Sequence, residues 1–164
     1  MSVRPYSPAD AVELFEALRD ERVWEHIPRQ LPQDADELDG LVRGPAAGMQ
    51  RAAFTVRQGG RVVGMTSLLF DASASQGVEI GATQFDPAVW GTGVNSIVKA
   101  LMIQELFAQD AQWIRFRTDE RNGRSAAAIL KLGATDLGVR QDTLVRRDGS
   151  VRSSRFFQLD RPLG

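Results

Sequence analysis

Apolar residues in the first quarter of the chain recur mainly at helical spacing. A short extended segment, residues 3–6, precedes a helix predicted over residues 8–20. Residues 23–28 carry tryptophan, histidine and proline, which indicates an irregular segment at the surface or over a cleft. A second helix is predicted over residues 34–42, and Gly44-Pro45 ends it.

From residue 51 the period of the apolar positions changes to two, which is typical of strands. Residues 51–57 and 61–70 alternate on either side of Gly59-Gly60, so we predict a β-hairpin there. A loop of small residues follows, and residues 78–85 form the next predicted strand. These segments together predict an antiparallel meander of three strands.

The second half of the chain alternates between helical and strand patterns. A long helix is predicted over residues 94–107, and its second half is apolar nearly all round, so we expect it to pack deep against a sheet. Residues 112–118 predict a strand, which the strand–helix–strand order makes parallel to residues 78–85. A short helix is expected over residues 122–133, and a hairpin over residues 139–159 closes the chain.

This order of elements predicts a single domain over residues 1–164 of mixed α/β (α+β) class, without the regular alternation of a doubly wound sheet. The net charge of -1 provides no field that would favour nucleic acid or a membrane as a partner. With no cysteine and one histidine, the chain lacks the residues for disulfides, a thiolate nucleophile or a histidine-rich metal site. The same scarcity of cysteine and histidine leads us to expect no metal. The first residues lack the apolar core of a signal peptide, so we expect a cytoplasmic protein.

Two glycines at the start of the long helix carry the first chemical signal. The turn Gly91-Thr92-Gly93 separates the strand ending at Phe85 from the helix beginning at Val94. Such a turn leaves backbone N–H groups pointing outward at the positive end of the helix dipole, which predicts a phosphate site. The alternative is a turn that only redirects the chain. It is not a P-loop, because no Gly-Lys-Ser/Thr closes it, and Ser96 stands where a dinucleotide fingerprint needs a third glycine.

A second motif narrows the class of phosphate ligand. The turn Trp90-Gly91-Thr92-Gly93-Val94-Asn95, followed by Asn122-x-x-Ser125 and Lys131-Leu132-Gly133-Ala134, resembles the GNAT superfamily of acyl-CoA-dependent N-acyltransferases. The likeness is greatest to the branch of ribosomal-protein N-terminal acetyltransferases and their small-substrate relatives. It covers almost the whole chain and implies a central mixed, mostly antiparallel sheet of about six to seven strands flanked by about four helices.

The resemblance implies acetyl-CoA (coenzyme A) as cosubstrate and no metal. The backbone of Gly91–Asn95 would bind its pyrophosphate, while Trp90 replaces the basic residue or glutamine usual in the family. The adenine end is expected to meet Arg121 or Arg124, unless these form an ordinary solvated face. The other implied contacts are with the pantetheine chain, along Thr83, Gln84 and Phe85 on one side and beside Asn122 and Ser125 on the other. Asn122 is equally suited to cap the helix that follows it.

The implied reaction is direct transfer of an acyl group, most often acetyl, to a primary amine in a ternary complex. The amine needs a base, because a lysine-type amine titrates near ~10.4. Glu79 is the first candidate, and an ordinary outward-facing strand glutamate is the alternative. His26 is the second candidate, and with the neighbouring Trp24, expected to be exposed, it would line the acceptor site. The single tyrosine, Tyr6, lies far from the asparagine motif, so we expect no tyrosine acid.

The sequence leaves other functions open. A non-catalytic acyl-CoA-binding or sensing module would keep the phosphate turn without the chemistry. A nucleotide-dependent oxidoreductase is a third hypothesis, which the missing third glycine argues against. The acceptor is expected to be a small-molecule or peptide amine: a protein N-terminus, an amino acid, a polyamine or an aminoglycoside. The closing hairpin is a candidate for pairing between two copies of the chain in a homodimer.

Overall fold

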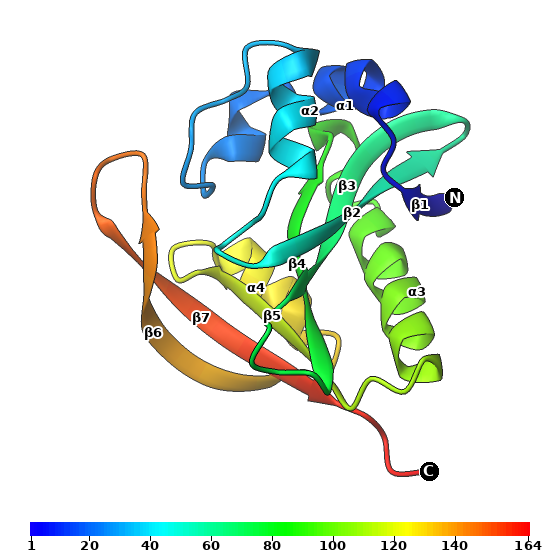
Figure 1. Ribbon diagram of the computed structural model, residues 1–164, viewed down its shortest axis with the longest axis vertical. Helices are drawn as coiled ribbons and strands as arrows, with labels where there is room; N and C mark the ends of the chain where they lie inside the picture. Colours follow the sequence, from blue (N-terminus) through cyan, green and yellow to red (C-terminus); the bar gives the residue numbers. More distant parts are fainter.

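The computed structural model describes all 164 residues and confirms the predicted order of elements (Figure 1). None of its helices is long and apolar enough to cross a membrane. The elements, with three short 3-10 helices written η, are β1 (Ser2–Pro5), η1 (Pro8–Asp10), α1 (Ala11–Leu18), η2 (Glu21–Trp24), α2 (Ala35–Arg43), β2 (Gln50–Gln58), β3 (Arg61–Phe70), β4 (Gly77–Phe85), η3 (Pro87–Val89), α3 (Val94–Ala108), β5 (Trp113–Asp119), α4 (Gly123–Leu130), β6 (Thr135–Val145) and β7 (Val151–Asp160).

All seven strands form one sheet, in the order β1-β2-β3-β4-β5-β7-β6. The β4–β5 pair is parallel, and every other neighbouring pair is antiparallel. This confirms the mixed, mostly antiparallel sheet flanked by four α-helices. Because β7 lies between β5 and β6, the closing hairpin pairs within the chain and leaves β6 at the edge. The turn of this hairpin reaches back to the segment after η2, where Arg147 donates to the Trp24 carbonyl (3.5 Å; Figure 1).

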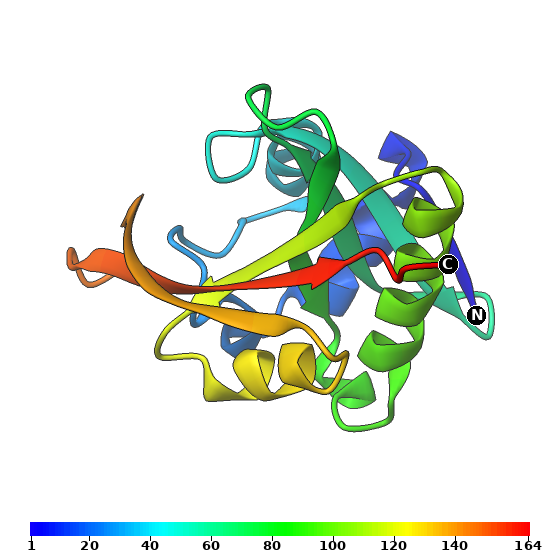
Figure 2. The same cartoon turned by 90° about the horizontal axis from the view of Figure 1, so that it is seen from below.

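Each face of the sheet is covered by two helices (Figures 1 and 2). On one face, α3 and α4 pack against apolar side chains that include Ile80 and Phe116. On the other face, α1 and α2 pack against Val62 and Met65. Because successive side chains of a strand point to opposite faces, the residues that precede Ile80 and follow Phe116, Glu79 and Arg117, point toward the α1–α2 side.

Helix α3 is not buried all round, so the expectation of a deeply packed helix was wrong. The side chains of Ile97 and Leu101 are 49% and 47% exposed. The sheet contacts a single face of the helix, through Val94, Val98 and Met102, and the opposite face is open to solvent. An apolar pattern of this kind therefore indicates one buried face here, with apolar residues continuing onto the solvent side.

The buried part of α3 also contains a lysine. Lys99 is 7% exposed, and its ammonium group donates to the Asn95 side-chain oxygen at 3.1 Å. Burial lowers the pKa of Lys99 to about 8. Between pH 8 and 10 the folded protein therefore releases this proton while the unfolded chain keeps it, so stability rises with pH in that window.

We expect Lys99→Met to raise the free energy of unfolding at pH 7 by about 1–3 kcal/mol, because the variant removes the cost of burying a charge. The gain should shrink as the pH approaches 10. Urea unfolding at a series of pH values measures both effects. Lys131→Met, at the other and exposed lysine, is the matched control and should leave the pH dependence unchanged. A gain that stays constant from pH 7 to 10 would contradict the account.

Candidate functional site

Strands β4 and β5 pair only at their beginnings and then separate. Beyond the pair Glu79–Arg115 no register joins them. In β4 the register with β3 shifts in the next few residues, and Ala82 takes a φ of 46°, as in a β-bulge. The β5 side of β4 between Ile80 and Phe85 is therefore an unpaired strand edge, to which an extended ligand with amide groups can hydrogen-bond.

The glycine turn lies directly after this edge, where α3 begins. Gly91 and Gly93 have φ values of 75° and 89°, in the left-handed region that glycine adopts without strain. A Cβ atom built on either glycine would meet nothing within 4 Å, so the space in front of the turn is open to a ligand. The sequence therefore folds locally into the turn that was predicted.

The turn presents a row of free backbone donors. The first hydrogen bond of α3 runs from the Ile97 N–H to the Gly93 carbonyl (3.1 Å). Most of the backbone N–H groups between Gly91 and Ser96 have no acceptor within the chain. The Thr92 N–H is an exception, because it donates to the Val89 carbonyl (3.3 Å). The free donors are therefore those of Gly91, Gly93, Val94, Asn95 and Ser96. Together with the helix dipole they make an anion site, in which Ser96 takes the place expected of Thr92.

Two arginines flank Trp90, the residue that departs from the family pattern. The Trp90 indole N–H donates to the Phe85 carbonyl (2.9 Å). The guanidinium of Arg124, on α4, lies 4.0 Å from the ring centroid, and that of Arg22, on η2, lies at 5.6 Å. Positive charge therefore stands beside the turn although the turn itself has no basic residue. Arg121 instead pairs with Asp148 (3.1 Å).

Asn122 and Ser125 lie at the start of α4, directly after β5. The Asn122 side-chain oxygen accepts the Ser125 N–H (3.1 Å), which is the helix cap foreseen as an alternative role. The position of this cap, across the separation from β4, is compatible with a second role toward a ligand between the strands.

A cavity of about 240 Å³, here called the first cavity, lies on the α1–α2 side of the sheet and reaches β4 and β5 just where they separate. Trp24 lines it but is not exposed as expected. Its side chain is 3% exposed, because the indole N–H donates to the Leu18 carbonyl (2.7 Å) inside the α1–α2 core. The walls are largely apolar and otherwise carry arginine, Glu79 and Gln84. The main lining residues are Trp24, Leu38, Leu41, Val42, Met65, Leu69, Glu79, Gln84, Arg29, Arg51, Arg117 and Arg152.

Glu79 faces this cavity and is not an outward-facing strand glutamate, because it is 6% exposed. Its two carboxylate oxygens accept from Arg117, at 2.8 and 3.0 Å. Arg117 also donates to Asp142 (3.3 Å). Burial alone would lower the pKa of Arg117, but the two carboxylates outweigh it and the pKa stands above its ordinary value. The Glu79 carboxylate is thus held in a fixed orientation at the base of the β4–β5 separation.

Gln84 contributes an unused donor to the first cavity. Its side chain is 8% exposed, and the amide nitrogen Nε2 is the one buried side-chain polar atom without a hydrogen-bond partner. Native proteins satisfy nearly all buried donors, so an unpaired amide at a cavity points to an oxygen of a ligand.

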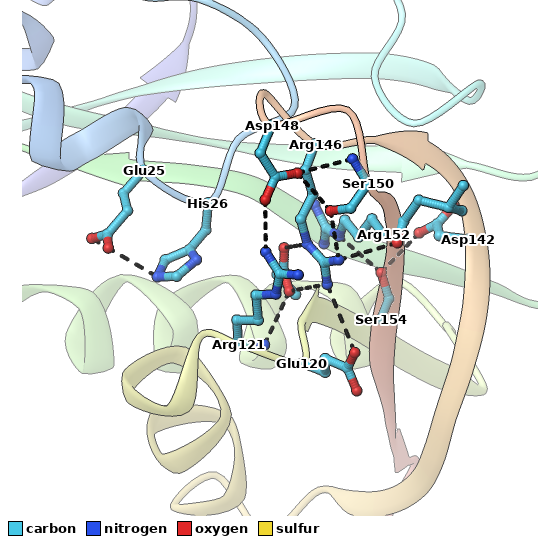
Figure 3. A network of polar contacts seen from close by, with 12 residues as sticks. Glu25, His26, Glu120, Arg121, Asp142, Arg146, Asp148, Ser150, Arg152 and Ser154 are labelled. Atoms are coloured by element: carbon cyan, nitrogen blue, oxygen red, sulfur yellow. Dashed lines mark hydrogen bonds and ion pairs between the residues drawn. The ribbon is translucent and has the colours of Figure 1, made fainter.

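His26 lies in a different place. A second cavity, of about 570 Å³, is lined by His26, Glu21, Arg22, Glu25, Asp119, Arg121, Arg146, Arg147 and Asp148. Figure 3 shows His26 with Glu25 on one side and the Arg146 network on the other. Arg146 binds both oxygens of Asp119 at 2.8 Å, which fixes the β6–β7 turn to the end of β5. The structure therefore does not bring the two candidate bases, Glu79 and His26, into one cavity.

Some features of the site carried no signal in the sequence. Three of the four arginines of the first cavity, Arg51, Arg117 and Arg152, come from separate strands, where each one fits an ordinary solvated strand position. Tyr6 donates to Asp39 (2.8 Å) and lines neither cavity.

No group of three or more His, Asp or Glu side chains is placed to hold a metal ion.

Comparisons with known proteins agree with this geometry. Residues 1–135 match the family model described as an acetyltransferase (GNAT) domain. No curated protein matches the chain in sequence.

Several solved structures share the fold. One is a probable acetyltransferase of the GNAT family from Chromobacterium violaceum, with a TM-score of 0.86 and 22% identity over 97% of this chain and 86% of that chain. Another is the ribosomal-protein-alanine N-acetyltransferase from Brucella melitensis, with a TM-score of 0.72 and 18% identity over 98% of this chain and 99% of that one. A third is the spermidine N-acetyltransferase from Vibrio cholerae in complex with CoA and spermine, with a TM-score of 0.75 and 12% identity over 98% and 95% of the two chains. At these identities the likeness shows the fold.

Proposed function

Since this chain belongs to the GNAT acetyltransferase family, we propose that it transfers an acetyl group from acetyl-CoA to a primary amine in a ternary complex. The observation that carries the proposal is the row of free backbone N–H groups from Gly91 to Ser96, next to the unpaired edge of β4. These two features suit the pyrophosphate and the amide-bearing arm of coenzyme A, respectively. Arg124, beside Trp90, adds positive charge at the phosphate end, whereas Arg22 is paired with Asp20 (2.7 Å).

The first cavity is the proposed acceptor site, and Glu79 is the proposed base. Glu79 is the one carboxylate among its lining residues, whereas His26 lines the second cavity. The amine nitrogen attacks the thioester carbonyl carbon and its proton passes to Glu79 directly or through water. The C–S bond breaks, and the departing thiolate takes up a proton from Glu79 or from water to give the free thiol. A backbone N–H of β4 near Gln84 or Phe85 is the proposed donor to the carbonyl oxygen. Arg117 orients the Glu79 carboxylate.

Acetyl-CoA at about 100 times its Kd should raise the melting temperature by about 5–10 °C, because a ligand that binds only the folded state stabilises it by mass action. Thermal-shift measurements with acetyl-CoA and with NADH test this, and NADH should give no shift. Stabilisation by NADH without stabilisation by acetyl-CoA would favour the dinucleotide-dependent alternative and overturn the proposal.

A non-catalytic acyl-CoA-binding module is the second candidate. It is favoured by one observation, namely that both oxygens of Glu79 are already bonded to Arg117. Release of free thiol from acetyl-CoA in the presence of amines distinguishes the two. Amine-dependent release supports the enzyme, and binding without release supports the module.

A further inference from the structure

The first cavity carries more positive than negative charge. Four arginines and one glutamate line it. Arg117 is neutralised by Glu79 and by Asp142 behind it. Even when Asp142 is counted, the charges of the four arginines exceed those of the two carboxylates by two elementary charges.

Arg51 enters the cavity from β2 without a carboxylate partner. Its guanidinium donates to the Ser67 hydroxyl (2.8 Å), the Leu41 carbonyl (3.3 Å) and the Met65 sulfur (3.8 Å), none of which carries charge. Burial, and the nearby charge of Arg29, lower the pKa of Arg51 to about 10. A cation held by neutral groups in a partly apolar cavity has lost water without gaining a counter-ion.

Arg152 repeats this situation from β7. It is 9% exposed, and its Nε donates to the Ser154 hydroxyl at 2.9 Å. No carboxylate lies within ion-pair distance of it, because Ser154 stands between Arg152 and Asp142 and donates to Asp142 at 2.9 Å (Figure 3). Buried arginines are normally paired, so Arg152 is a second cation without a direct counter-ion at the cavity.

A neutral donor accompanies these cations. The unpartnered Nε2 of Gln84, on β4, adds an N–H group that needs an oxygen acceptor. The remaining walls are apolar, formed by residues such as Trp24, Leu38 and Met65. The cavity thus combines an apolar body of small volume with arginine and amide donors, which is the donor set that binds carboxylate or phosphate oxygens.

We infer that the acceptor is a compact amine that carries an anionic group, a carboxylate or a phosphate, which binds at Arg51 and Arg152. This inference rests on the proposed acetyl transfer and specifies its substrate class. A polyamine or an aminoglycoside is disfavoured, because its additional cationic groups would meet uncompensated arginines in a small, partly apolar cavity. The amine of the acceptor would lie toward Glu79, with the anionic group at the two arginines.

The test compares amines that differ only in the anionic group. Leucine is compared with leucinamide and isopentylamine, O-phosphoethanolamine with ethanolamine, and spermidine serves as the polycation. Thiol release from acetyl-CoA gives kcat and KM for each amine. We expect kcat/KM for the anionic member of at least one set to exceed that of its neutral or cationic analogues by about 10- to 100-fold, the range for a charge-assisted hydrogen bond. The set that shows the preference identifies carboxylate or phosphate as the anion.

Two variants test whether Arg51 and Arg152 cause the preference for anionic amines. Arg51→Gln and Arg152→Gln should each raise KM for the anionic amine by about 10-fold or more and reduce its advantage over the neutral analogue, with little change in KM for acetyl-CoA. Arg19→Gln, at a surface arginine paired with Glu16, is the matched control and should change neither. Stabilisation of each variant by acetyl-CoA verifies that it is folded.

Equal or better use of the neutral or cationic analogues in both sets, or of spermidine over both anionic amines, would overturn the inference while leaving the proposed transfer intact. The same holds if the preference exists but both arginine variants keep it. If acetyl-CoA binds and none of these amines is acetylated, the inference is overturned and the non-catalytic acyl-CoA-binding module is favoured. Failure of acetyl-CoA to bind would instead refute the proposed function itself, so the two failures are distinguishable.

Discussion

Replacement of Glu79 by Gln lowers kcat for amine acetylation by about 10²- to 10³-fold, the usual contribution of a general base, while acetyl-CoA still binds. The amide has nearly the shape of the carboxylate but cannot accept the amine proton. The release of free thiol gives kcat for the variant and for the unmodified protein. The affinity of each for acetyl-CoA is measured in parallel.

This variant also breaks a buried ion pair, and a control must separate that effect from chemistry. Arg117 keeps its ion pair with Asp142 (3.3 Å), so the loss of stability should stay below the about 3–5 kcal/mol of an uncompensated buried charge. The triple variant Glu79→Gln/Arg117→Gln/Asp142→Asn removes all three charges of this cluster and should recover much of the lost stability. If Glu79 is the base, kcat stays low in the triple variant. Recovery of turnover together with stability would instead assign Glu79 a purely structural role.

The second large effect concerns the glycine turn. Gly93→Val should weaken acetyl-CoA binding by about 100-fold, because a β-branched residue strongly resists a φ of 89° and the turn must rearrange to relieve the strain. The N–H groups of Val94, Asn95 and Ser96 would then no longer converge on one point. Isothermal titration calorimetry with CoA and with acetyl-CoA measures the loss.

A matched variant is available at a distant glycine. Gly60, in the β2–β3 turn, has a φ of 78° and, like Gly93, open space around a built Cβ atom. Gly60→Val should therefore cost a similar amount of stability and leave acetyl-CoA affinity unchanged. If Gly93→Val and Gly60→Val bind acetyl-CoA with the same affinity, the glycine turn does not bind the phosphates.

Local signals in the sequence were sufficient for the elements and for the conformation of the glycine turn. Apolar periods of 3.6 and of two residues distinguish α2 from the β2–β3 hairpin, and the turn needs two residues with positive φ at a helix start, which glycine supplies. Two such motifs at a suitable separation also indicated the family. These properties depend on neighbouring residues, so a single sequence contains them.

The acceptor side could not be predicted in the same way. Arg51, Arg117 and Arg152 lie on three strands, and they meet at one cavity because β7 is inserted between β5 and β6. In the sequence each of them is one polar position of an alternating strand. The alternative of an outward-facing Glu79 stayed open for the same reason, since its partner Arg117 comes from the strand after α3. Trp24 was misjudged because the surrounding prolines suggested an exposed loop, whereas its indole fills the α1–α2 core.

The position of the β6–β7 hairpin has a consequence for how this enzyme could diversify. The hairpin contributes Leu144 and Arg152 to the first cavity, and Asp142 to the network behind it, but no residue to the glycine turn or to the open edge of β4. In the proposed function the hairpin therefore takes part in acceptor recognition alone, whereas β4 borders both sites. Exchange of this one hairpin should change the choice of amine and leave the proposed acetyl-CoA site unchanged. The hairpin is therefore a suitable segment in which acceptor specificity can evolve or be engineered.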